Sequence, residues 1–308
     1  MPDNAKVVII GAGPTGLGCA YRLKELGYTN FKVFERSGYI GGLAHSFVDP
    51  QGFTWDIGGH VMFSHYAYYD KCFEKLMGDE FTLNNRESWV RMYETWVPYP
   101  FQNNIRYLPK QAAYECMAGL IRAQSGKGAV ASPAAARNFG EFIDAVFGEG
   151  IATHFMRPYN FKVWAHPPEM MNKTWIGERV AVIDIERALK NIMLGSDDFG
   201  WGPNNQFKFP LRGGTGEFYK RFERVLGYAE QGGHVHLNKE VRTIDVDGKV
   251  IEFTDGTRET YDVLVSAMPL DVLCGKVLKE ERHQGIEASR HQGIKGSRCE
   301  RSRRLRRG

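Results

Sequence analysis

The run Val7-Val8-Ile9-Ile10-Gly11-Ala12-Gly13-Pro14-Thr15-Gly16 decides the fold of the N-terminal part of this chain. Its four β-branched residues predict a short strand that is buried on both faces, as in a parallel sheet. The G-x-G-x-x-G pattern then lies between that strand and a helix predicted over residues 15–26. In this context the glycines allow a tight turn, a close approach of backbone to a pyrophosphate, and close packing of helix on strand. Pro14 suits the first helical turn, where a missing N–H costs little.

A second strand is predicted over Phe31–Phe34, and it ends at Glu35-Arg36. A carboxylate in this position can accept hydrogen bonds from ribose hydroxyl groups. The alternative is a glycine-rich turn with an unrelated surface acid. Because strand, helix and acid all follow in register, we favour a dinucleotide-binding Rossmann-type unit.

Two further glycine pairs indicate which dinucleotide binds. Gly41-Gly42-Leu43 resembles the second glycine pair of glutathione-reductase-like flavoproteins, in which backbone passes close to the pyrophosphate of FAD. Gly58-Gly59-His60 follows a third predicted strand, Phe53–Ile57, and suggests backbone pressed against a flat ring. Each could be an ordinary loop, and a lone histidine is more often structural than functional. Together they predict FAD.

The rest of the chain divides into an insert, a returning sheet and a tail. A hairpin over 88–97, a helix over 110–124, a helix capped by Asn138 and Glu141, and a helical stretch over 178–194 predict a largely helical, substrate-binding insert at 70–210. Strands over 241–246, 250–253 and 261–267 predict part of an antiparallel sheet and a strand that rejoins the parallel sheet. The predicted fold is therefore α/β, with a discontinuous FAD-binding domain at 1–69 and 211–272. Residues 276–308 repeat an Arg-His-Gln-Gly-Ile segment, are rich in arginine, and predict a disordered basic tail.

Composition excludes several classes of protein. The formal charge of +4 comes entirely from the tail, so the body does not present the basic surface of a nucleic-acid-binding protein. Five scattered cysteines without a CxxC motif are typical of reduced thiols, and no metal site is predicted. Neither a signal peptide nor an apolar run of about 20 residues is evident, so we predict a cytoplasmic protein without a membrane partner.

Longer strings resemble the UDP-galactopyranose mutases of the eukaryotic type, between about Val7 and Val272. The first is the histidine loop Gly58-Gly59-His60-Val61-Met62-Phe63-Ser64-His65. Four Trp-containing strings agree: Trp96-Val97-Pro98-Tyr99-Pro100-Phe101-Gln102-Asn103-Asn104, Phe155-Met156-Arg157-Pro158-Tyr159-Asn160-Phe161-Lys162-Val163-Trp164, Trp175-Ile176-Gly177-Glu178-Arg179-Val180 and Trp201-Gly202-Pro203-Asn204. The last is Phe209-Pro210-Leu211-Arg212-Gly213-Gly214-Thr215-Gly216.

The residue types in these strings suit a nucleotide-sugar pocket. Tyr99, Phe101 and Trp164 offer flat faces for a uracil ring, and Gln102 and Asn160 offer amides for its polar edge. Arg179 offers a planar fork for the diphosphate, and Asn204 could hold a phosphate or a sugar hydroxyl. Taken singly, each aromatic residue is more often a core residue, and an arginine is more often in a surface ion pair.

The resemblance implies a flavin-dependent isomerase that interconverts UDP-galactopyranose and UDP-galactofuranose through an adduct between flavin N5 and the sugar. It implies that FAD must be reduced, with NADPH or NADH as the reductant. The sequence leaves open whether the chain forms an oligomer. It places His60 and Arg86 near the flavin, Phe63 and His65 at the sugar, Arg179 at the diphosphate, and the backbone of Val241 at the adenine.

Two other hypotheses remain open at this point. One is an amine-oxidase-like FAD oxidoreductase of the same fold, which has no need of a UDP pocket. The other is a truncated, non-catalytic nucleotide-binding protein, because nothing after Val272 matches the family's second diphosphate-binding arginine or its last flavin-contacting segment. A truncated sheet would also predict poor solubility.

Overall fold

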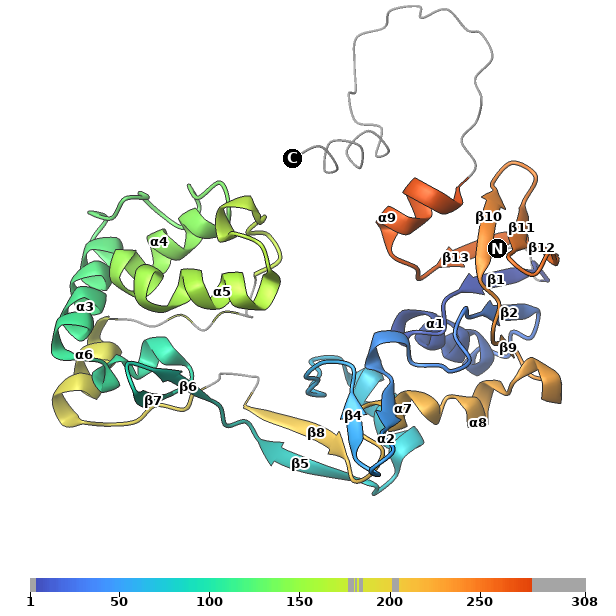
Figure 1. The fold of residues 1–308 in the computed structure, drawn as a ribbon, viewed down its shortest axis with the longest axis horizontal. Coiled ribbons are helices and arrows are strands. Elements are labelled where there is room, and N and C mark those ends of the chain that lie inside the picture. The colour runs from blue at the N-terminus through green and yellow to red at the C-terminus, as the bar shows by residue number, and fades with distance from the viewer. Residues whose placement is uncertain (1–3, 177–179, 181, 183–184, 201–204, 279–308) are drawn as a thin grey trace, which may run out of the picture. The chain divides into compact units, whose positions relative to one another are not determined.

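The computed structural model describes residues 4–176, 180, 182, 185–200 and 205–278 (Figure 1). The predicted tail falls outside these ranges from residue 279 onward, as do parts of 177–184 and all of 201–204. The chain divides into two compact units, one from Met1–Leu83 with Lys208–Gly308 and the other from Asn84–Phe207. Each unit is described by itself.

The first unit is built on a four-stranded parallel sheet with the order β13-β1-β2-β9. The strands are β1 (Val7–Ile10), β2 (Phe31–Phe34), β9 (Val235–His236) and β13 (Val263–Ser266). All four residues of β1 are buried, as a strand with neighbours on both edges and cover on both faces requires. Helix α1 (Pro14–Glu25) packs its buried side chains Leu17, Ala20 and Tyr21 into the same core. The predicted α/β Rossmann-type unit is confirmed.

Smaller elements complete the first unit. A three-stranded antiparallel sheet is formed by β10 (Val241–Asp245), β11 (Val250–Phe253) and β12 (Arg258–Thr260), which confirms the predicted antiparallel portion. A hairpin pairs β3 (Ser46–Val48) with β4 (Thr54–Asp56). The helices are α2 (Ala67–Met77), α7 (Gly216–Lys220), α8 (Glu223–Leu226) and α9 (Leu270–Val272), with short turns η1 (Gly42–Ala44), η8 (Ala229–Gln231) and η9 (Leu273–Val277).

The second unit is largely helical, with one hairpin. Its helices are α3 (Lys110–Gln124), α4 (Phe139–Ile151), the π-helix η4 (Ala152–Met156), α5 (Arg157–Trp164) and α6 (Ile185–Leu194). The hairpin pairs β6 (Trp89–Met92) with β7 (Thr95–Pro98), and short turns lie at η2 (Phe101–Asn103), η3 (Ile105–Tyr107) and η5 (Pro168–Met170). Strands β5 (Phe81–Asn85) and β8 (Gln206–Pro210) pair where the chain leaves the first unit and returns to it. The start of the helix predicted over 178–194 lies outside the described residues.

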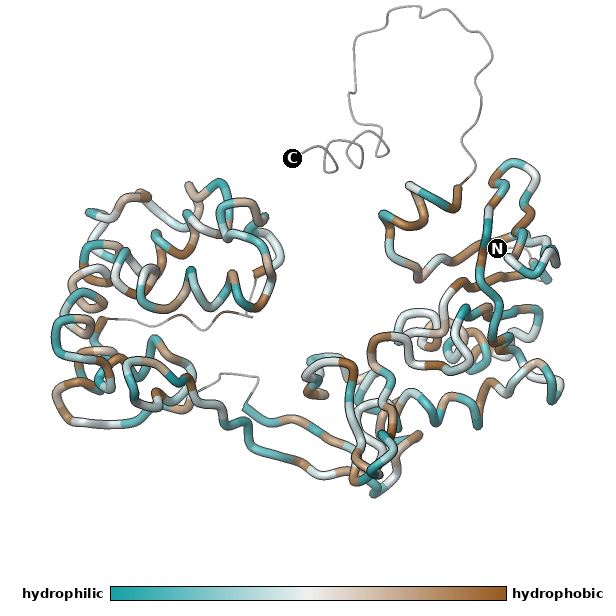
Figure 2. Tube along the Cα trace, in the orientation of Figure 1, coloured by the Kyte–Doolittle hydropathy of each residue, from teal (hydrophilic) through white to brown (hydrophobic). Residues whose placement is uncertain are grey.

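Apolar residues divide between buried cores and exposed positions. Figure 2 shows hydrophobic and hydrophilic residues alternating along the helices of both units. No helix among the described residues is long and apolar enough to cross a bilayer. Several large apolar side chains of the β3–β4 hairpin are exposed, among them Phe53 (64%) and Trp55 (54%).

The predicted cap of α4 is present. The side-chain oxygen of Asn138 accepts a hydrogen bond from the Glu141 backbone N–H at 2.9 Å. We expect Asn138→Ala to lower the free energy of unfolding by about 1 kcal/mol, because that helix N–H loses its acceptor. Asn138→Asp keeps an acceptor and serves as the control, which should unfold within about 0.5 kcal/mol of the parent chain in a urea titration. Equal losses in the two variants would contradict a capping role.

Candidate nucleotide-binding site

The turn after β1 is held so tightly that only glycine fits at two of its positions. Gly11 has a φ of +97°, and its N–H donates to the carbonyl oxygen of Phe34 at 2.8 Å. A Cβ atom on Gly16 would lie 1.8 Å from the Gly11 carbonyl oxygen. The turn therefore packs against the first turn of α1 with no space for a side chain between them.

The N-terminus of α1 is open toward a ligand. Gly13 is the N-cap with an extended backbone, no side chain caps it, and Pro14 follows as the first helical residue. The first helical hydrogen bond runs from the Leu17 N–H to the Gly13 carbonyl at 2.9 Å, and Thr15 is exposed. The N–H groups of a first helical turn have no acceptor inside the helix and carry the positive end of its dipole, which suits a pyrophosphate.

The second glycine pair lies directly against the first. The Gly41 N–H donates to the Ala12 carbonyl at 2.8 Å, and a Cβ on Gly42 would lie 3.1 Å from the Cα of Gly13. Leu43, the next residue along the chain, is exposed, and so is Arg36, which follows Glu35. Two glycine segments that are distant in sequence thus form one backbone surface without side chains.

Glu35 lies at the end of β2 with only 8% of its surface exposed. Its carboxylate accepts the Ala12 N–H at 2.8 Å and the Ser37 N–H at 2.9 Å. Each carboxylate oxygen has a second lone pair, so ribose hydroxyls can still be accepted. The Glu35 carbonyl also accepts the Lys239 N–H at 2.8 Å, which brings the start of β10, and with it the buried Val241, to this end of β2.

We expect Glu35→Gln to destabilise the first unit by about 1–3 kcal/mol, because the amide nitrogen cannot accept the N–H that one carboxylate oxygen now accepts. The measurement is thermal or urea unfolding of the full chain. Glu230→Gln, at an exposed position of the same unit, is the control and should change stability by no more than about 0.5 kcal/mol. A Glu35→Gln variant as stable as this control would show that the two N–H groups do not depend on the charge.

The histidine loop and strand β13 each contain a buried polar atom that has no hydrogen-bond partner among the described residues. These atoms are the Nδ1 of His60 and the Oγ of Ser266. Buried polar groups are nearly always satisfied, so each of these atoms is suited to a polar group of a ligand. Ser266 ends β13 at the carboxyl edge of the parallel sheet, where ligands bind in α/β folds. Sequence reasoning missed Ser266. Its signal was a polar residue ending an apolar strand that returns beside β1.

The histidine loop is anchored to β8 but keeps its aromatic residues exposed. The Lys208 N–H donates to the Met62 carbonyl at 2.7 Å. Phe63 is 40% exposed and makes an edge-to-face contact with His65, with ring centroids 5.8 Å apart. Gly58 has a φ of +87°, and Gly59 beside it is exposed.

A polar network that the sequence reasoning also missed fixes the glycine-rich loop before α7. Asp56 accepts hydrogen bonds from the backbone N–H of Thr215 at 3.0 Å and from its hydroxyl at 2.9 Å. The Ser46 hydroxyl also contacts Asp56, and it accepts the Gly216 N–H at 2.7 Å. The loop is thereby tied to the β3–β4 hairpin, close to the Gly41-Gly42 pair.

In the second unit, the predicted uracil-binding residues gather around η2 and α5. Phe101 is fully buried and stacks on Phe155 with centroids 4.3 Å apart, so its ring belongs to the core and its backbone alone can face a ligand. The ring centroid of Tyr99 lies 6.1 Å from that of Tyr159, and Tyr99 is partly buried. Burial and the neighbouring Tyr159 raise the pKa of Tyr99, and the charge of Arg86 opposes that shift.

The amide residues of this group are buried, and the tryptophan is not. Asn160 is 6% exposed and donates to the Met156 carbonyl at 2.7 Å, while Gln102 is 1% exposed. Trp164 is 46% exposed and lies one helical turn after Asn160 on α5, in edge contact with Trp175. Arg179 and Asn204, the predicted diphosphate and hydroxyl ligands, lie outside the described residues.

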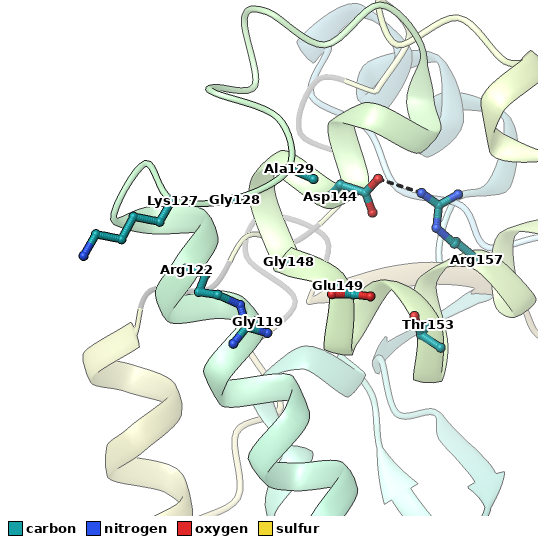
Figure 3. Close-up of a pocket in the computed structure, with 10 residues that line it drawn as sticks. All are labelled: Gly119, Arg122, Lys127, Gly128, Ala129, Asp144, Gly148, Glu149, Thr153 and Arg157. Atoms are coloured by element: carbon teal, nitrogen blue, oxygen red, sulfur yellow. Dashed lines mark hydrogen bonds and ion pairs between the residues drawn. The ribbon is translucent and has the colours of Figure 1, made fainter.

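A cavity of about 460 Å³ in the second unit has no predicted site residue in its lining. Figure 3 shows it between α3 and α4, with Arg122, Asp144, Glu149 and Arg157 around it. Arg157 and Asp144 form an ion pair of 2.7 Å across it. The lining therefore carries charges of both signs, two of which are paired with each other.

Comparison with known proteins identifies the family. The model of the family described as flavin containing amine oxidoreductase matches residues 14–296. The chain is 28% identical over 201 residues to a Baeyer-Villiger monooxygenase of Pseudomonas aeruginosa, which covers 58% of this chain and 33% of that protein. It is 42% identical over 60 residues to protoporphyrinogen oxidase 2 of Arabidopsis thaliana, or 20% of this chain and 11% of that protein.

Among solved structures, a reduced UDP-galactopyranose mutase is similar with a TM-score of 0.82 and 47% identity, over 90% of this chain and 58% of that chain. A putrescine oxidase bound to putrescine has a TM-score of 0.57 at 17% identity, over 89% of this chain and 60% of that chain, and shares the fold alone. The chain thus spans less than two thirds of the length of each of these proteins. Since the family model covers well over half of its residues, the chain belongs to the flavin containing amine oxidoreductase family.

Proposed function

We propose that this chain is a UDP-galactopyranose mutase of the eukaryotic type, a flavin-dependent isomerase that interconverts UDP-galactopyranose and UDP-galactofuranose. The observation that carries the proposal is the 47% identity to a reduced mutase over 90% of this chain. The strings that face the nucleotide sugar in that family are also present here, around Tyr99, Asn160 and Trp164.

FAD fits the residues of the first unit. The N-terminus of α1 with Gly13 would hold the pyrophosphate, Glu35 the ribose of the adenosine half, and the backbone at Val241 the adenine. His60 and Ser266 supply buried polar atoms that have no partner in the described part of the chain, as a ring system with polar edges would require. When bound and reduced, the flavin would supply the nucleophile for the anomeric carbon of the sugar.

The protein's own part is binding and charge stabilisation. Tyr99 and Trp164 would hold the uracil, Gln102 and Asn160 its polar edge, and Phe63 and His65 the sugar. Arg86 would lie near the flavin and the sugar. Arg179 would stabilise the negative charge that develops on the diphosphate as the bond to the sugar breaks, with Asn204 as a further ligand. We assign these roles to a FAD-binding domain at 1–69 and 211–272 and a substrate-binding insert at 70–210.

The test uses the full chain, purified without added reductant. We expect flavin absorbance near 450 nm. UDP-galactofuranose should be converted to UDP-galactopyranose only after the flavin is reduced, for example with dithionite. Chromatography of the nucleotide sugars measures the conversion. NADPH and NADH are compared as reductants in parallel. Trp164→Ala should raise KM for the sugar nucleotide, whereas the exposed Tyr114→Phe should not. A flavin-loaded, reduced chain with no conversion would overturn the isomerase.

A second candidate is an amine-oxidase-like oxidoreductase, which membership of the family favours. It predicts that putrescine or another amine bleaches the bound flavin under anaerobic conditions. The mutase proposal predicts no bleaching by amines. A yellow chain that converts neither the nucleotide sugar nor an amine would support the third hypothesis, a truncated, non-catalytic nucleotide-binding protein. A cytoplasmic location and the absence of nucleic-acid or membrane partners remain predictions, and the oligomeric state stays open.

A further inference from the structure

Three side chains of the second unit form a hydrogen-bonded chain that the proposed isomerase does not use. The Tyr93 hydroxyl lies 2.6 Å from Nδ1 of His154. The Nε2 of the same histidine lies 2.6 Å from Oε2 of Glu115. Phenol, imidazole and carboxylate thus follow one another in line.

These three residues lie on three separate elements of the second unit. Tyr93 and Glu94 form the turn between β6 and β7, with φ values of 47° and 60°. His154 lies on the π-helix η4, a form of helix that occurs often at functional sites. Glu115 lies on α3, where Gln111 donates to its other oxygen at 2.9 Å.

The protons of this chain can be assigned from the charge of its end member. Hydrogen bonds from Gln111 and His154 lower the pKa of Glu115, so its carboxylate is ionised and only accepts. Nε2 of a neutral His154 therefore carries the proton that Glu115 accepts, and Nδ1 presents its lone pair to the Tyr93 O–H. This is the order of nucleophile, base and orienting acid found in activated hydroxyl nucleophiles.

Exposure distinguishes the histidine from the two other members, since the Glu115 side chain is 43% exposed. Tyr93 is 48% exposed, so an electrophile in solution can reach its ring edge and hydroxyl. The side chain of His154 is only 17% exposed, so we expect the electrophile to react with the phenol and not with the imidazole. Apart from His154 and Glu115, the titratable group nearest to Tyr93 in the sequence is Glu94, the next residue along the turn.

We propose that Tyr93 is a base-activated nucleophile that accepts an acyl or sulfonyl group from electrophiles such as activated esters and sulfonyl fluorides. The Tyr93 oxygen forms the new bond to the carbonyl carbon or the sulfur, and its proton passes to Nδ1 of His154. The leaving group departs with the electron pair of the broken bond, and His154 then returns the proton to solvent or to the leaving group. Glu115 stabilises the imidazolium between these two proton transfers.

The test is labelling of the full chain with phenylmethanesulfonyl fluoride, followed by peptide mass spectrometry to obtain a rate for each tyrosine. The internal control is Tyr114, which is 66% exposed on α3 and has no hydrogen bond to a histidine among the described residues. We expect Tyr93 to react at least about a hundredfold faster than Tyr114 at pH 7.5, the lower end of what a positioned base provides.

The pH profile separates base assistance from simple exposure. The Tyr93 rate should depend only weakly on pH, because the hydrogen-bonded base accepts its proton. The Tyr114 rate should climb about tenfold per pH unit, as expected of a phenol that reacts only as its phenolate. His154→Phe should lower the Tyr93 rate to that of Tyr114, and Glu115→Gln should lower it in part, with near-UV circular dichroism to confirm folding.

Equal rates for the two tyrosines, or parallel pH profiles, would overturn the proposal even if both variants failed to fold. So would a folded His154→Phe variant whose Tyr93 reacts as fast as before. Neither readout depends on flavin or on the nucleotide sugar, so the proposal stands apart from the isomerase.

Discussion

Replacing Gly16 by alanine is expected to lower the midpoint of thermal unfolding of the first unit by roughly 6–12 °C and to abolish retention of flavin. A Cβ at this position would lie 1.8 Å from the Gly11 carbonyl oxygen and 3.0 Å from its carbonyl carbon. Both atoms belong to backbone, which cannot rotate away as a flexible side chain can. Overpacking of this kind costs on the order of 3 kcal/mol.

The backbone of the turn is held on the other side as well. The Gly11 N–H is bonded to β2, and Ala12 is bonded to both Glu35 and Gly41. Relief of the clash must therefore move the N-terminus of α1 off the sheet, and the N–H groups proposed for the pyrophosphate move with it. Flavin absorbance should fall together with stability.

Gly18→Ala is the matched control for this prediction. It lies in the same helix, and a Cβ there would meet nothing within 4 Å. Helix propensity predicts that Gly18→Ala stabilises the unit by about 0.5–1 kcal/mol. Similar unfolding midpoints for the two variants, measured by circular dichroism on the full chain, would refute the packing argument.

Elements with a complete local signal could be predicted from the sequence. The predicted strands over 7–10 and 31–34 and the helix over 110–124 have the same bounds in the structure, because β-branched runs and helical periodicity are properties of neighbouring residues. The strand over 53–57 was found as Thr54–Asp56, but its partner Ser46–Val48 was not predicted. A three-residue strand with exposed apolar side chains carries no periodic signal.

The site could be predicted where a motif lies in the same short stretch of sequence as the strand and helix that position it. The turn at Gly11 and the acid at Glu35 follow from strand, helix and spacing. That the Glu35 carboxylate accepts two backbone N–H groups does not follow, since those bonds depend on how the chain folds back. Nor does the bond between Asp56 and Thr215, which joins residues 159 positions apart.

Residue type alone also gave a wrong prediction of which aromatic faces a ligand can reach. Phe101 was predicted to offer a flat face, yet its ring is fully buried against Phe155. An aromatic residue in a binding string can equally be a core residue, and only packing separates the two. The predicted roles of Arg179 and Asn204 stay predictions.

Gly148→Ala is expected to have the largest effect in the second unit, a loss on the order of 4 kcal/mol of unfolding free energy. Gly148 lies within α4 at a φ of 73° and a ψ of 169°, a conformation almost closed to other residues. An added Cβ would also lie 2.1 Å from the carbonyl oxygen of Gly119 on α3. Strain and clash therefore act together, at the contact between the two longest helices of the unit.

Gly126→Ala tests a positive φ without a clash. Gly126 follows α3 with a φ of +72°, nearly that of Gly148, but a Cβ there would meet nothing within 4 Å. It should cost only about 1 kcal/mol. Urea unfolding followed by circular dichroism at 222 nm reports this helical unit directly. Should the two alanine variants lose equal stability, backbone strain would account for both, and the contact of α3 with α4 would have room that the structure does not give it.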